Sequence, residues 1–446
     1  MGVYHFIAIG GIGMSGLAKY LLEDGHTVSG SDIADSKYIS ALKELGAKVT
    51  IGHSAENVPD GATVIVSTAI RNNNPELLRA KELGLKIYHR SDMLKEIAEQ
   101  AQEVNKTFIG FSGTHGKTTT SGLCSYVLDK AGLEPSFVDG GIVPELHTNA
   151  QHKGGKYFVA ELDESDGTIV KYNPDILVIN NIEEDHLDFY KNGMADIIKT
   201  FNTAVSRSKK VLINNDNEGT KYLKGNFITY GLNSADYIAK NIRYSKEGTT
   251  FDVYKQGELL ISARIQLSGI HNVYNTLAVI SALSESGMDI NLVNDYLYGF
   301  SGMGRRFQKV CELNGIQVYD DYAHHPTEIK ATLNAASLKF GKEHIVAVFQ
   351  PHRYTRLKAL WNEFKNSFDE AKRVIVTDVY SASEDVIEGI TGEKFASDIG
   401  AEYISGSMKE VAQKLLPTLK TDDIVIGLGA GTITALGKEL EHLELV

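Results

Sequence analysis

Short apolar runs alternate with helix-period segments along the whole chain, and the alternation starts afresh at two points. The first block opens with an apolar run at residues 3–9, a glycine turn and a helix-period stretch at 14–22. A second block begins at 107–111 after a polar segment, and a third follows the glycine-rich turn at 300–307. Such alternation is typical of sheets covered by helices. We therefore predict an α/β fold of three domains, at residues 1–104, 105–303 and 304–446.

The three domains should differ in their sheets. Strands and helices alternate throughout the first and third domains, as they do in Rossmann-like folds. The second ends in β-like stretches between residues 237 and 267, which suggest an antiparallel edge and hence a mixed sheet. Gly302 and Gly304 indicate a hinge before the third domain.

Charge and cysteine content exclude several classes of protein. The 45 Lys and Arg residues against 57 Asp and Glu give a net charge of -12, which disfavours general nucleic-acid binding. Two cysteines cannot build a disulfide framework, and free thiols favour a reducing compartment. No run approaches the ~20 apolar residues that span a bilayer. The composition predicts a soluble cytoplasmic enzyme without membrane insertion.

A dinucleotide fingerprint lies between the first strand and helix. Residues 11–16 read G-x-G-x-x-G, and Asp32 follows about 20 residues on. The glycines let the backbone approach a pyrophosphate at a helix N-terminus, and UDP carries one as NAD does. The motif alone therefore leaves three interpretations open, namely NAD, a UDP-bearing ligand and a tight turn without ligand.

A second phosphate-binding motif opens the central block. Residues 112–119 read SGTHGKTT between a strand and a helix, where amide groups, the helix dipole and Lys117 can hold phosphates. Thr118 can offer its hydroxyl oxygen to Mg²⁺. The sequence departs from the P-loop pattern at Phe111, where that pattern has glycine. We predict a P-loop ATPase domain, with a chance loop as the alternative.

Polar residues follow other apolar runs. Glu161 ends the strand YFVAE, where it is placed like the metal-side acid of a P-loop enzyme, and DESD follows at 163–166. His186 comes after the strand ILVINN and is either a metal ligand or a surface histidine. In the third domain two basic-aromatic loops, at 320–326 and 350–356, indicate an anion pocket unless they form structural salt bridges.

Seven segments together resemble the Mur ligase family, in that family's order and approximate spacing. They are GTHGKTT (113–119), DESD (163–166), EEDH (183–186), HNVYN (271–275), GRRF (304–307), DDYAHHPTE (320–328) and FQPHRYTR (349–356). The last segment is similar to that of family members that add L-alanine. In those that reattach a recycled tripeptide we expect an EPRSNT-like loop, and a tyrosine in place of Ser165.

The resemblance implies an ATP-dependent ligase that joins L-alanine to the lactyl carboxylate of UDP-N-acetylmuramate through an acyl phosphate, in peptidoglycan synthesis. The first domain would bind UDP, the central one ATP and the third the amino acid. ATP and two Mg²⁺ ions would be required, and the chain would act as a monomer or homodimer. Two rivals leave motifs unexplained: a nicotinamide dehydrogenase rests on residues 11–16 and Asp32 alone, and an ATP-driven regulatory module does not account for FQPHRYTR.

The resemblance also implies site residues. The UDP sugar would contact Gly11, Ile12, Gly13, Met14, Ser15, Asp32 and Ser67. ATP would contact Gly113, Thr114, His115, Gly116, Lys117, Thr118, Thr119, His271, Asn275 and Asp321. The metal ligands would be Thr118, Glu161 and His186. Alanine would contact Tyr322, His324, His352, Arg353 and Arg356. The catalytic groups would be Lys117, Glu161, His186, Arg305 and Arg306, with His324 and His352 both open as general base.

Overall fold

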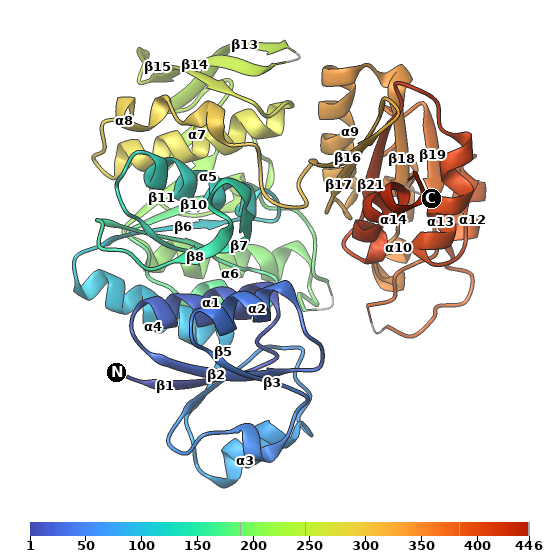
Figure 1. Cartoon of the computed structure of the whole chain (residues 1–446). Coiled ribbons are helices and arrows are strands. Elements are labelled where there is room, and N and C mark those ends of the chain that lie inside the picture. Colours follow the sequence, from blue (N-terminus) through green and yellow to red (C-terminus); the bar gives the residue numbers. More distant parts are fainter. Residues whose placement is uncertain (188, 246, 383, 445–446) are drawn as a thin grey trace. The chain divides into compact units, whose positions relative to one another are not determined.

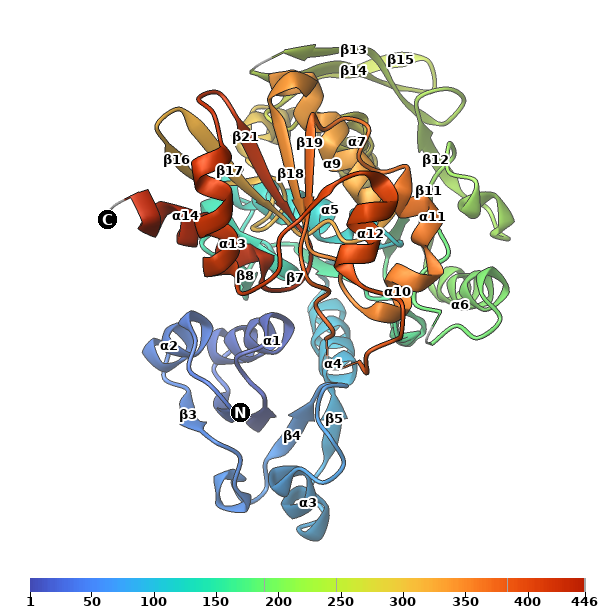
Figure 2. The same ribbon diagram turned by 90° about the vertical axis from the view of Figure 1, so that its right-hand side faces the viewer.

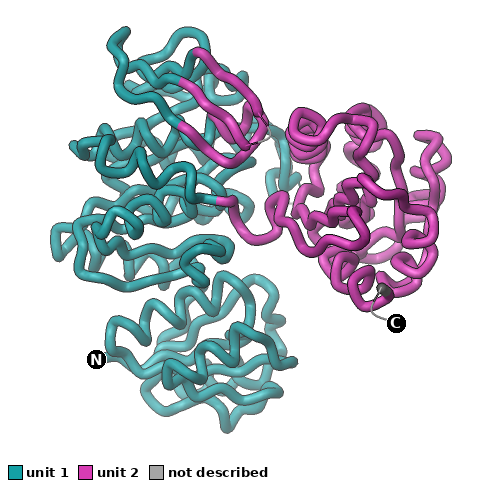
Figure 3. Tube along the Cα trace, turned by 45° about the horizontal axis from the view of Figure 1, so that its top comes forward, with its two compact units in different colours: residues 1–240, 252–263, 274–300 teal, residues 241–251, 264–273, 301–446 magenta. Residues whose placement is uncertain are grey.

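The computed structural model describes residues 1–187, 189–245, 247–382 and 384–444. Two compact units divide the chain (Figure 3). Unit 1 comprises residues 1–240, 252–263 and 274–300, and unit 2 comprises residues 241–251, 264–273 and 301–446. No helix among the described residues is long and apolar enough to cross a membrane.

The first sheet has five parallel strands in the order β3-β2-β1-β4-β5 (Figure 1). Its strands are β1 (Val3–Ile7), β2 (Thr27–Asp32), β3 (Lys48–Ile51), β4 (Thr63–Val66) and β5 (Ile87–His89). The accompanying helices are α1 (Ile12–Glu23), α2 (Lys37–Glu44), α3 (Pro75–Glu82) and α4 (Arg90–Glu103). The predicted alternation of strand and helix is confirmed here.

The second sheet has ten strands in the order β15-β14-β13-β12-β11-β10-β6-β9-β7-β8. Its strands are β6 (Thr107–Ser112), β7 (Ser136–Val143), β8 (Thr148–Gln151), β9 (Tyr157–Glu161), β10 (Ile176–Ile179), β11 (Lys210–Asn214), β12 (Ile228–Gly231), β13 (Tyr237–Ser245), β14 (Gly248–Lys255) and β15 (Glu258–Ile265). The helices are α5 (Lys117–Lys130), α6 (Met194–Arg207), α7 (Ile270–Glu285) and α8 (Asn291–Asn294). Strand β8 pairs antiparallel with β7, whereas β6, β9, β10 and β11 are parallel, so the sheet is mixed as predicted. This antiparallel pair lies at the β8 edge, opposite the edge at residues 237–267 from which it was predicted, where β13 pairs parallel with β12.

The third sheet has six strands in the order β16-β17-β21-β18-β19-β20, of which only β16 pairs antiparallel among the described strands. The strands are β16 (Gln308–Leu313), β17 (Ile316–Asp321), β18 (Ile345–Phe349), β19 (Arg373–Val376), β20 (Glu402–Tyr403) and β21 (Ile424–Leu428). The helices are α9 (Pro326–Phe340), α10 (Tyr354–Ala359), α11 (Trp361–Lys365), α12 (Gly392–Ile399), α13 (Met408–Leu415) and α14 (Leu436–Glu444). The helical sequence pattern around Leu360 predicts one helix, but the structure has two, α10 and α11.

Both faces of this third sheet are buried, which explains its nearly continuous apolar strands. Along β18, Ala347 and Phe349 pack with helices α9 to α12, while Val346 and Val348 pack with α13 and α14 on the other face (Figure 2). Strands β17 and β18 each pair in parallel with β21, and β19 pairs in parallel with β18. The carboxyl ends of β17, β18 and β19 therefore lie at the same edge of the sheet.

Polar contacts fasten the first sheet's elements to the second sheet within unit 1. Lys19 on α1 donates to the carbonyl of Ala150 at 2.7 Å, and Asn149 donates to the carbonyl of Ile12 at 2.7 Å. One apolar core continues from Phe6 on β1 to Phe158 on β9. The glycine turn at the start of α1 is thereby held against β8.

A buried carboxylate organises the interior of the first sheet. Glu76 on α3 is fully buried and accepts hydrogen bonds from Ser31 at 2.6 Å, Asn57 at 2.7 Å and His5 at 3.2 Å. Burial alone would raise the pKa of Glu76, but these bonds outweigh it and lower the pKa to about 2. The ionised carboxylate therefore links β1, β2, α3 and the loop after β3.

We expect Glu76→Gln to reduce the local stability of β1 and β2 by about 2–4 kcal/mol, because it removes one partner of a buried charged network. The pKa of Glu76 is lower in the folded chain, so its contribution is present above the unfolded value of 4.5 and is lost as the pH falls toward 2. The difference between wild type and variant should thus shrink below about pH 4.5. Hydrogen exchange of the β1 and β2 amides measures it, and a pH-independent difference would contradict the argument.

Candidate functional site

The glycine turn after β1 is fixed by Asp32 at the end of β2. The Oδ2 atom of Asp32 accepts the N–H of Gly10 at 2.9 Å. Gly11 is the N-cap of α1, and no described side chain caps this helix. Its first N–H groups are therefore oriented to meet an anion or water. Gly16 is required for packing, since a Cβ there would lie 2.7 Å from Nδ2 of Asn149.

The predicted UDP-sugar residues fall into two groups. Met14 and Ser15 are buried in α1, and Met14 belongs to the apolar core, so its side chain is not presented to a ligand. The remaining predicted residues lie at the carboxyl edge of the first sheet. Gly11 caps α1, Ile12 and Gly13 begin that helix, Asp32 ends β2, and Ser67 directly follows β4.

A cation beside this turn was not predicted from the sequence. Arg90 is the first residue of α4, and its Nη1 lies 3.8 Å from the position that a Cβ on Gly13 would take. Its Nη2 pairs with Asp163 at 2.6 Å. Arg90 follows β5 directly, which is the signal that could have found it, because ligand-facing residues often end parallel strands.

The phosphate loop connects β6 to α5 and is held by two asparagines. Gly113 and Gly116 have φ values of 127° and 82°, which explains why glycine stands at both positions. The carbonyl and side-chain oxygens of Asn181 accept the N–H groups of Thr114 and His115 at 3.0 and 2.7 Å. Asn180 and Asn181 end the strand ILVINN, but no motif marked them as supports of the loop.

Lys117 folds back over this loop. Its Nζ donates to the carbonyls of Gly113 at 2.7 Å and Thr114 at 3.1 Å, and it pairs with Glu164 at 2.9 Å. Burial would lower the pKa of Lys117, but Glu164 and Asp163 raise it, so the ammonium stays protonated. Glu164 was not predicted as its partner.

The carboxylates of DESD differ in charge state. Burial raises the pKa of Glu164 to about 7, despite the neighbouring ammonium of Lys117. Burial also acts to raise the pKa of Asp163, but Lys117 and Arg90 outweigh it and hold that pKa well below its usual range. Asp163 is therefore a permanent anion, whereas Glu164 can exchange a proton near neutral pH.

The predicted metal ligands lie around the same loop. Thr118 is in the first turn of α5, and Glu161 ends β9, where its Oε2 accepts the N–H of Gly140 at 3.1 Å. His186 has a φ of 55°, and its Nε2 lies 3.9 Å from Oε1 of Glu164. Hydroxyl and carboxylate oxygens are ligands that Mg²⁺ prefers, so this donor set fits the ion, with the imidazole as its least typical member.

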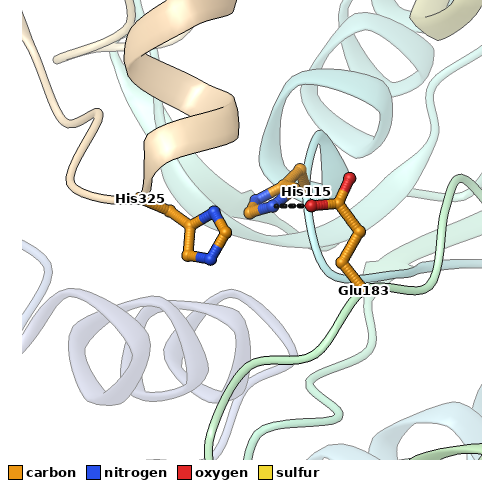
Figure 4. A group of neighbouring side chains, drawn as sticks. All are labelled: His115, Glu183 and His325. Carbon is orange, nitrogen blue, oxygen red and sulfur yellow. Dashed lines mark ion pairs between the residues drawn. The ribbon is translucent and has the colours of Figure 1, made fainter. Parts of the chain in front are cut away.

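Of two further predicted ATP residues, His115 lies in this loop and Asn275 contacts it. His115 pairs with Glu183 at 3.4 Å (Figure 4). Asn275 on α7 is buried, and a Cβ on Gly116 would lie 2.7 Å from its Oδ1. His325, also drawn in Figure 4, accepts the N–H of Thr327 at the start of α9 in unit 2.

Asp321 is buried, and His271 is half-buried. Burial, with the charge of Arg306, lowers the pKa of His271 to about 4, so its ring is neutral. Asp321 uses its two oxygens to accept the N–H groups of Ala323 and Phe307, each at 2.7 Å. Burial raises the pKa of Asp321 to about 6. This carboxyl therefore fixes the loop that contains Phe307.

The two predicted arginines of that loop have different partners. Arg305 has a φ of 61°, pairs with Asp320 at 3.1 Å and donates to the carbonyl of Gly429 at 2.9 Å. Arg306 pairs with Glu328 at 3.5 Å. Both guanidinium groups lie over the ring of Tyr322, at 4.9 and 5.2 Å from its centroid.

Aromatic rings from three loops form a row in unit 2. Tyr322 contacts His324 edge-on at 5.1 Å between centroids, and His324 contacts His352 at 5.7 Å. His352 stacks on Tyr380 at 5.5 Å and 16°. Tyr380 follows β19 in a loop that no motif marked, and it was not predicted. The row occupies the shared carboxyl edge of β17, β18 and β19.

Two arginines follow β18, Arg353 as the N-cap of α10 and Arg356 on that helix, and both have defined contacts. Arg353 has a φ of 69° and donates its N–H to the carbonyl of Tyr380 at 2.8 Å. The Nη1 of Arg356 lies 3.3 Å from Nδ1 of His352. The structure thus brings together, within unit 2, all five residues predicted for the amino acid.

Three consecutive stretches match domains of one protein family. Residues 3–102 match the Mur ligase family, catalytic domain. Residues 111–283 match the Mur ligase middle domain, and residues 305–431 match the Mur ligase, glutamate ligase domain.

Similar proteins cover almost the whole chain. The UDP-N-acetylmuramate–L-alanine ligases of Geotalea daltonii and of a Sulfurihydrogenibium species are 40% and 41% identical, over 98% of this chain and 96% of each relative. A crystal structure of the UDP-N-acetylmuramate-alanine ligase of Thermotoga maritima has a TM-score of 0.85 and 29% identity, with 100% of this chain and 99% of that chain covered. A murein peptide ligase of Psychrobacter arcticus shares the fold, with a TM-score of 0.72, 22% identity and coverage of 100% and 99%. The three-domain α/β fold is confirmed, and the chain belongs to the Mur ligase family.

Proposed function

We propose that this chain is the ligase that joins L-alanine to the lactyl carboxylate of UDP-N-acetylmuramate, with ATP converted to ADP and phosphate, in peptidoglycan synthesis. The observation that carries this conclusion is the 40% identity to L-alanine ligases over 98% of the chain. The phosphate loop with its half-buried Lys117 and the arginine-bearing segment of unit 2 supply the two binding chemistries that this reaction needs.

Domain roles follow from the sites. Residues 1–104 would bind UDP at the uncapped start of α1, residues 105–303 would bind ATP at the loop before α5, and residues 304–446 would bind alanine. We propose these boundaries and the site residues named in the sequence analysis as the working assignment. A cytoplasmic location follows from the supply of ATP and UDP sugars, and a monomer or homodimer would suffice.

The chemistry requires activation, because a carboxylate is a poor electrophile. The lactyl carboxylate attacks the γ-phosphate in line, and the resulting acyl phosphate has a good leaving group. The amine of alanine then attacks the carbonyl carbon and phosphate departs. Negative charge gathers in both steps, so Lys117, Arg305 and Arg306 would act chiefly by electrostatic stabilisation and positioning.

Mg²⁺ would be held by Thr118, Glu161 and His186, as two ions, and would neutralise phosphate charge. We expect Glu161→Gln and His186→Ala each to raise the Mg²⁺ concentration needed for half-maximal activity by about tenfold or more. Glu218→Gln is the matched control, since that carboxylate is exposed and pairs only with Lys221 among the described residues. Unshifted Mg²⁺ titration curves for His186→Ala would contradict its role as a ligand.

The substrate assignment has a direct test. Phosphate release is measured with ATP and UDP-N-acetylmuramate in the presence of L-alanine or of the recycled tripeptide. We expect turnover with alanine and little with the tripeptide. Preference for the tripeptide would transfer the assignment to the recycling ligases, and NAD binding without phosphate release would revive the dehydrogenase hypothesis.

A further inference from the structure

His324 is held in one tautomer by two acceptors. Its Nδ1 lies 2.9 Å from the carbonyl oxygen of Tyr322 and 3.3 Å from Oε2 of Glu328. A carbonyl oxygen can only accept, so Nδ1 carries the proton. In a neutral imidazole the other nitrogen is then an acceptor. Nε2 of His324 is thus a lone-pair acceptor, and no group in the described part of the chain hydrogen bonds to it.

His352 is held in the opposite tautomer. Its Nδ1 lies 3.3 Å from Nη1 of Arg356, and a guanidinium group can only donate. Nδ1 is therefore the acceptor, and the proton of the neutral ring is on Nε2. The two histidines lie next to each other in the row of rings, yet they present opposite functions: His324 offers a lone pair and His352 offers an N–H.

Both rings are neutral at physiological pH. Burial lowers the pKa of His324 to about 4, with Arg356 and Arg306 acting in the same direction against Glu328. Burial lowers the pKa of His352 to about 3, together with His324, Arg356, Arg353 and Arg305. A neutral ring with a low pKa is a weak base, so it accepts a proton readily only from a strongly acidic nitrogen.

We propose that His324, and not His352, takes the proton that the alanine nitrogen releases when it attacks the acyl phosphate. This inference rests on the proposed function. Alanine loses its first proton to solvent and binds as the free amine. The nitrogen lone pair then forms the C–N bond, the C–O bond to phosphate breaks with its electron pair on phosphate, and the N–H proton passes to Nε2 of His324. A nitrogen that has just formed this bond is positively charged and strongly acidic, which suits an acceptor of low pKa.

The test compares His324→Ala, His324→Gln and His352→Gln in the full-length enzyme with saturating ATP and UDP-N-acetylmuramate. We expect kcat with alanine to fall by about 10²- to 10⁴-fold in His324→Ala, the usual contribution of a general base. Glutamine can accept a hydrogen bond but cannot take the proton. His324→Gln should therefore have a KM for alanine close to that of the wild type, while its kcat stays as low as that of His324→Ala. His352→Gln should mainly raise the KM for alanine, and added 4-methylimidazole should not restore its turnover, because Nε2 of His352 carries a proton and cannot act as the base.

Two readouts separate proton transfer from a structural role. Acyl phosphate trapped by borohydride should still form in His324→Ala, and added 4-methylimidazole should restore turnover in proportion to its free-base concentration. Loss of the trapped intermediate, full kcat in His324→Gln, or a kcat of His324→Ala within tenfold of wild type would each overturn the proposal. If the wild-type enzyme itself did not ligate alanine, the proposed function would be overturned instead. The failure of this inference and the failure of the proposed function are therefore distinguishable.

Discussion

Replacing Lys117 by Met should lower kcat for ligation by about 10²- to 10³-fold. The ammonium lies over the phosphate loop, where it donates to the Gly113 and Thr114 carbonyls and pairs with Glu164. Preorganised positive charge of this kind gives a typical loss of about 10²- to 10³-fold for a single donor. The binding of UDP-N-acetylmuramate should change little, since that ligand is assigned to the first sheet. Phosphate release and calorimetric binding measure the two quantities.

Lys117→Met should also lower the stability of the fold. The experiment must therefore separate the loss of phosphate stabilisation from the loss of folding stability. It leaves Glu164 buried without its cation, and an unpaired buried charge costs about 3–5 kcal/mol. The cost is smaller where the carboxyl can take up a proton, which a pKa of about 7 permits. Lys117→Met with Glu164→Gln removes both charges and should recover stability without recovering turnover.

Turnover restored in that double variant would reject the role of Lys117 in phosphate binding, because the loss in the single variant would then be structural. Glu164→Gln alone is the second control. It keeps the ammonium and should retain far more activity than Lys117→Met.

The strand–helix alternation and the phosphate loop were predictable because they depend on local sequence. An apolar run that ends in glycine and leads into a helix is dictated within about ten residues, and the predicted run at 107–111 lies within β6. The break between α10 and α11 at Leu360 was harder to predict. Leu360 has a φ of -110°, which interrupts an otherwise continuous helical pattern, and no proline or glycine in the sequence marks this position.

The partners across the site were not predictable from one sequence. Glu161, Asp163 and Glu164 follow one strand, and spacing cannot decide which of them meets Lys117. Asn181 supports the phosphate loop from a neighbouring strand, a contact that exists only once β6 and β10 pair. Tyr380 likewise joins the amino-acid residues through the pairing of β18 with β19. The sequence motifs were sufficient to identify the loops of the site. The contacts between those loops depend on which strands are neighbours in the sheet.

Arg353→Lys or Arg356→Lys should raise the KM for alanine by about ten- to a hundredfold, the result of losing about 1.5–3 kcal/mol of charged hydrogen bonding. The carbonyl of Tyr380 holds the backbone of Arg353, and Arg356 lies on α10 with its Nη1 3.3 Å from Nδ1 of His352, so both residues are positioned before the substrate arrives. A lysine keeps the charge but cannot form the two parallel bonds that orient a carboxylate. The amine would then lie at no fixed distance from the acyl phosphate.

The control is Arg373→Lys. Arg373 begins β19 and donates through Nε and Nη2 to the two carboxylate oxygens of Glu402, each at 2.7 Å, so it already has its own carboxylate partner. Its alanine KM should stay at the wild-type value. The KM values for ATP and the UDP sugar should move little in all three variants, and borohydride should still trap the acyl phosphate, because that intermediate forms before the amine attacks. If Arg353→Lys and Arg356→Lys both kept the wild-type KM for alanine, the assignment of this segment to alanine binding would be rejected. If both variants instead raised the KM for ATP, the segment would act on phosphate and not on the amino acid.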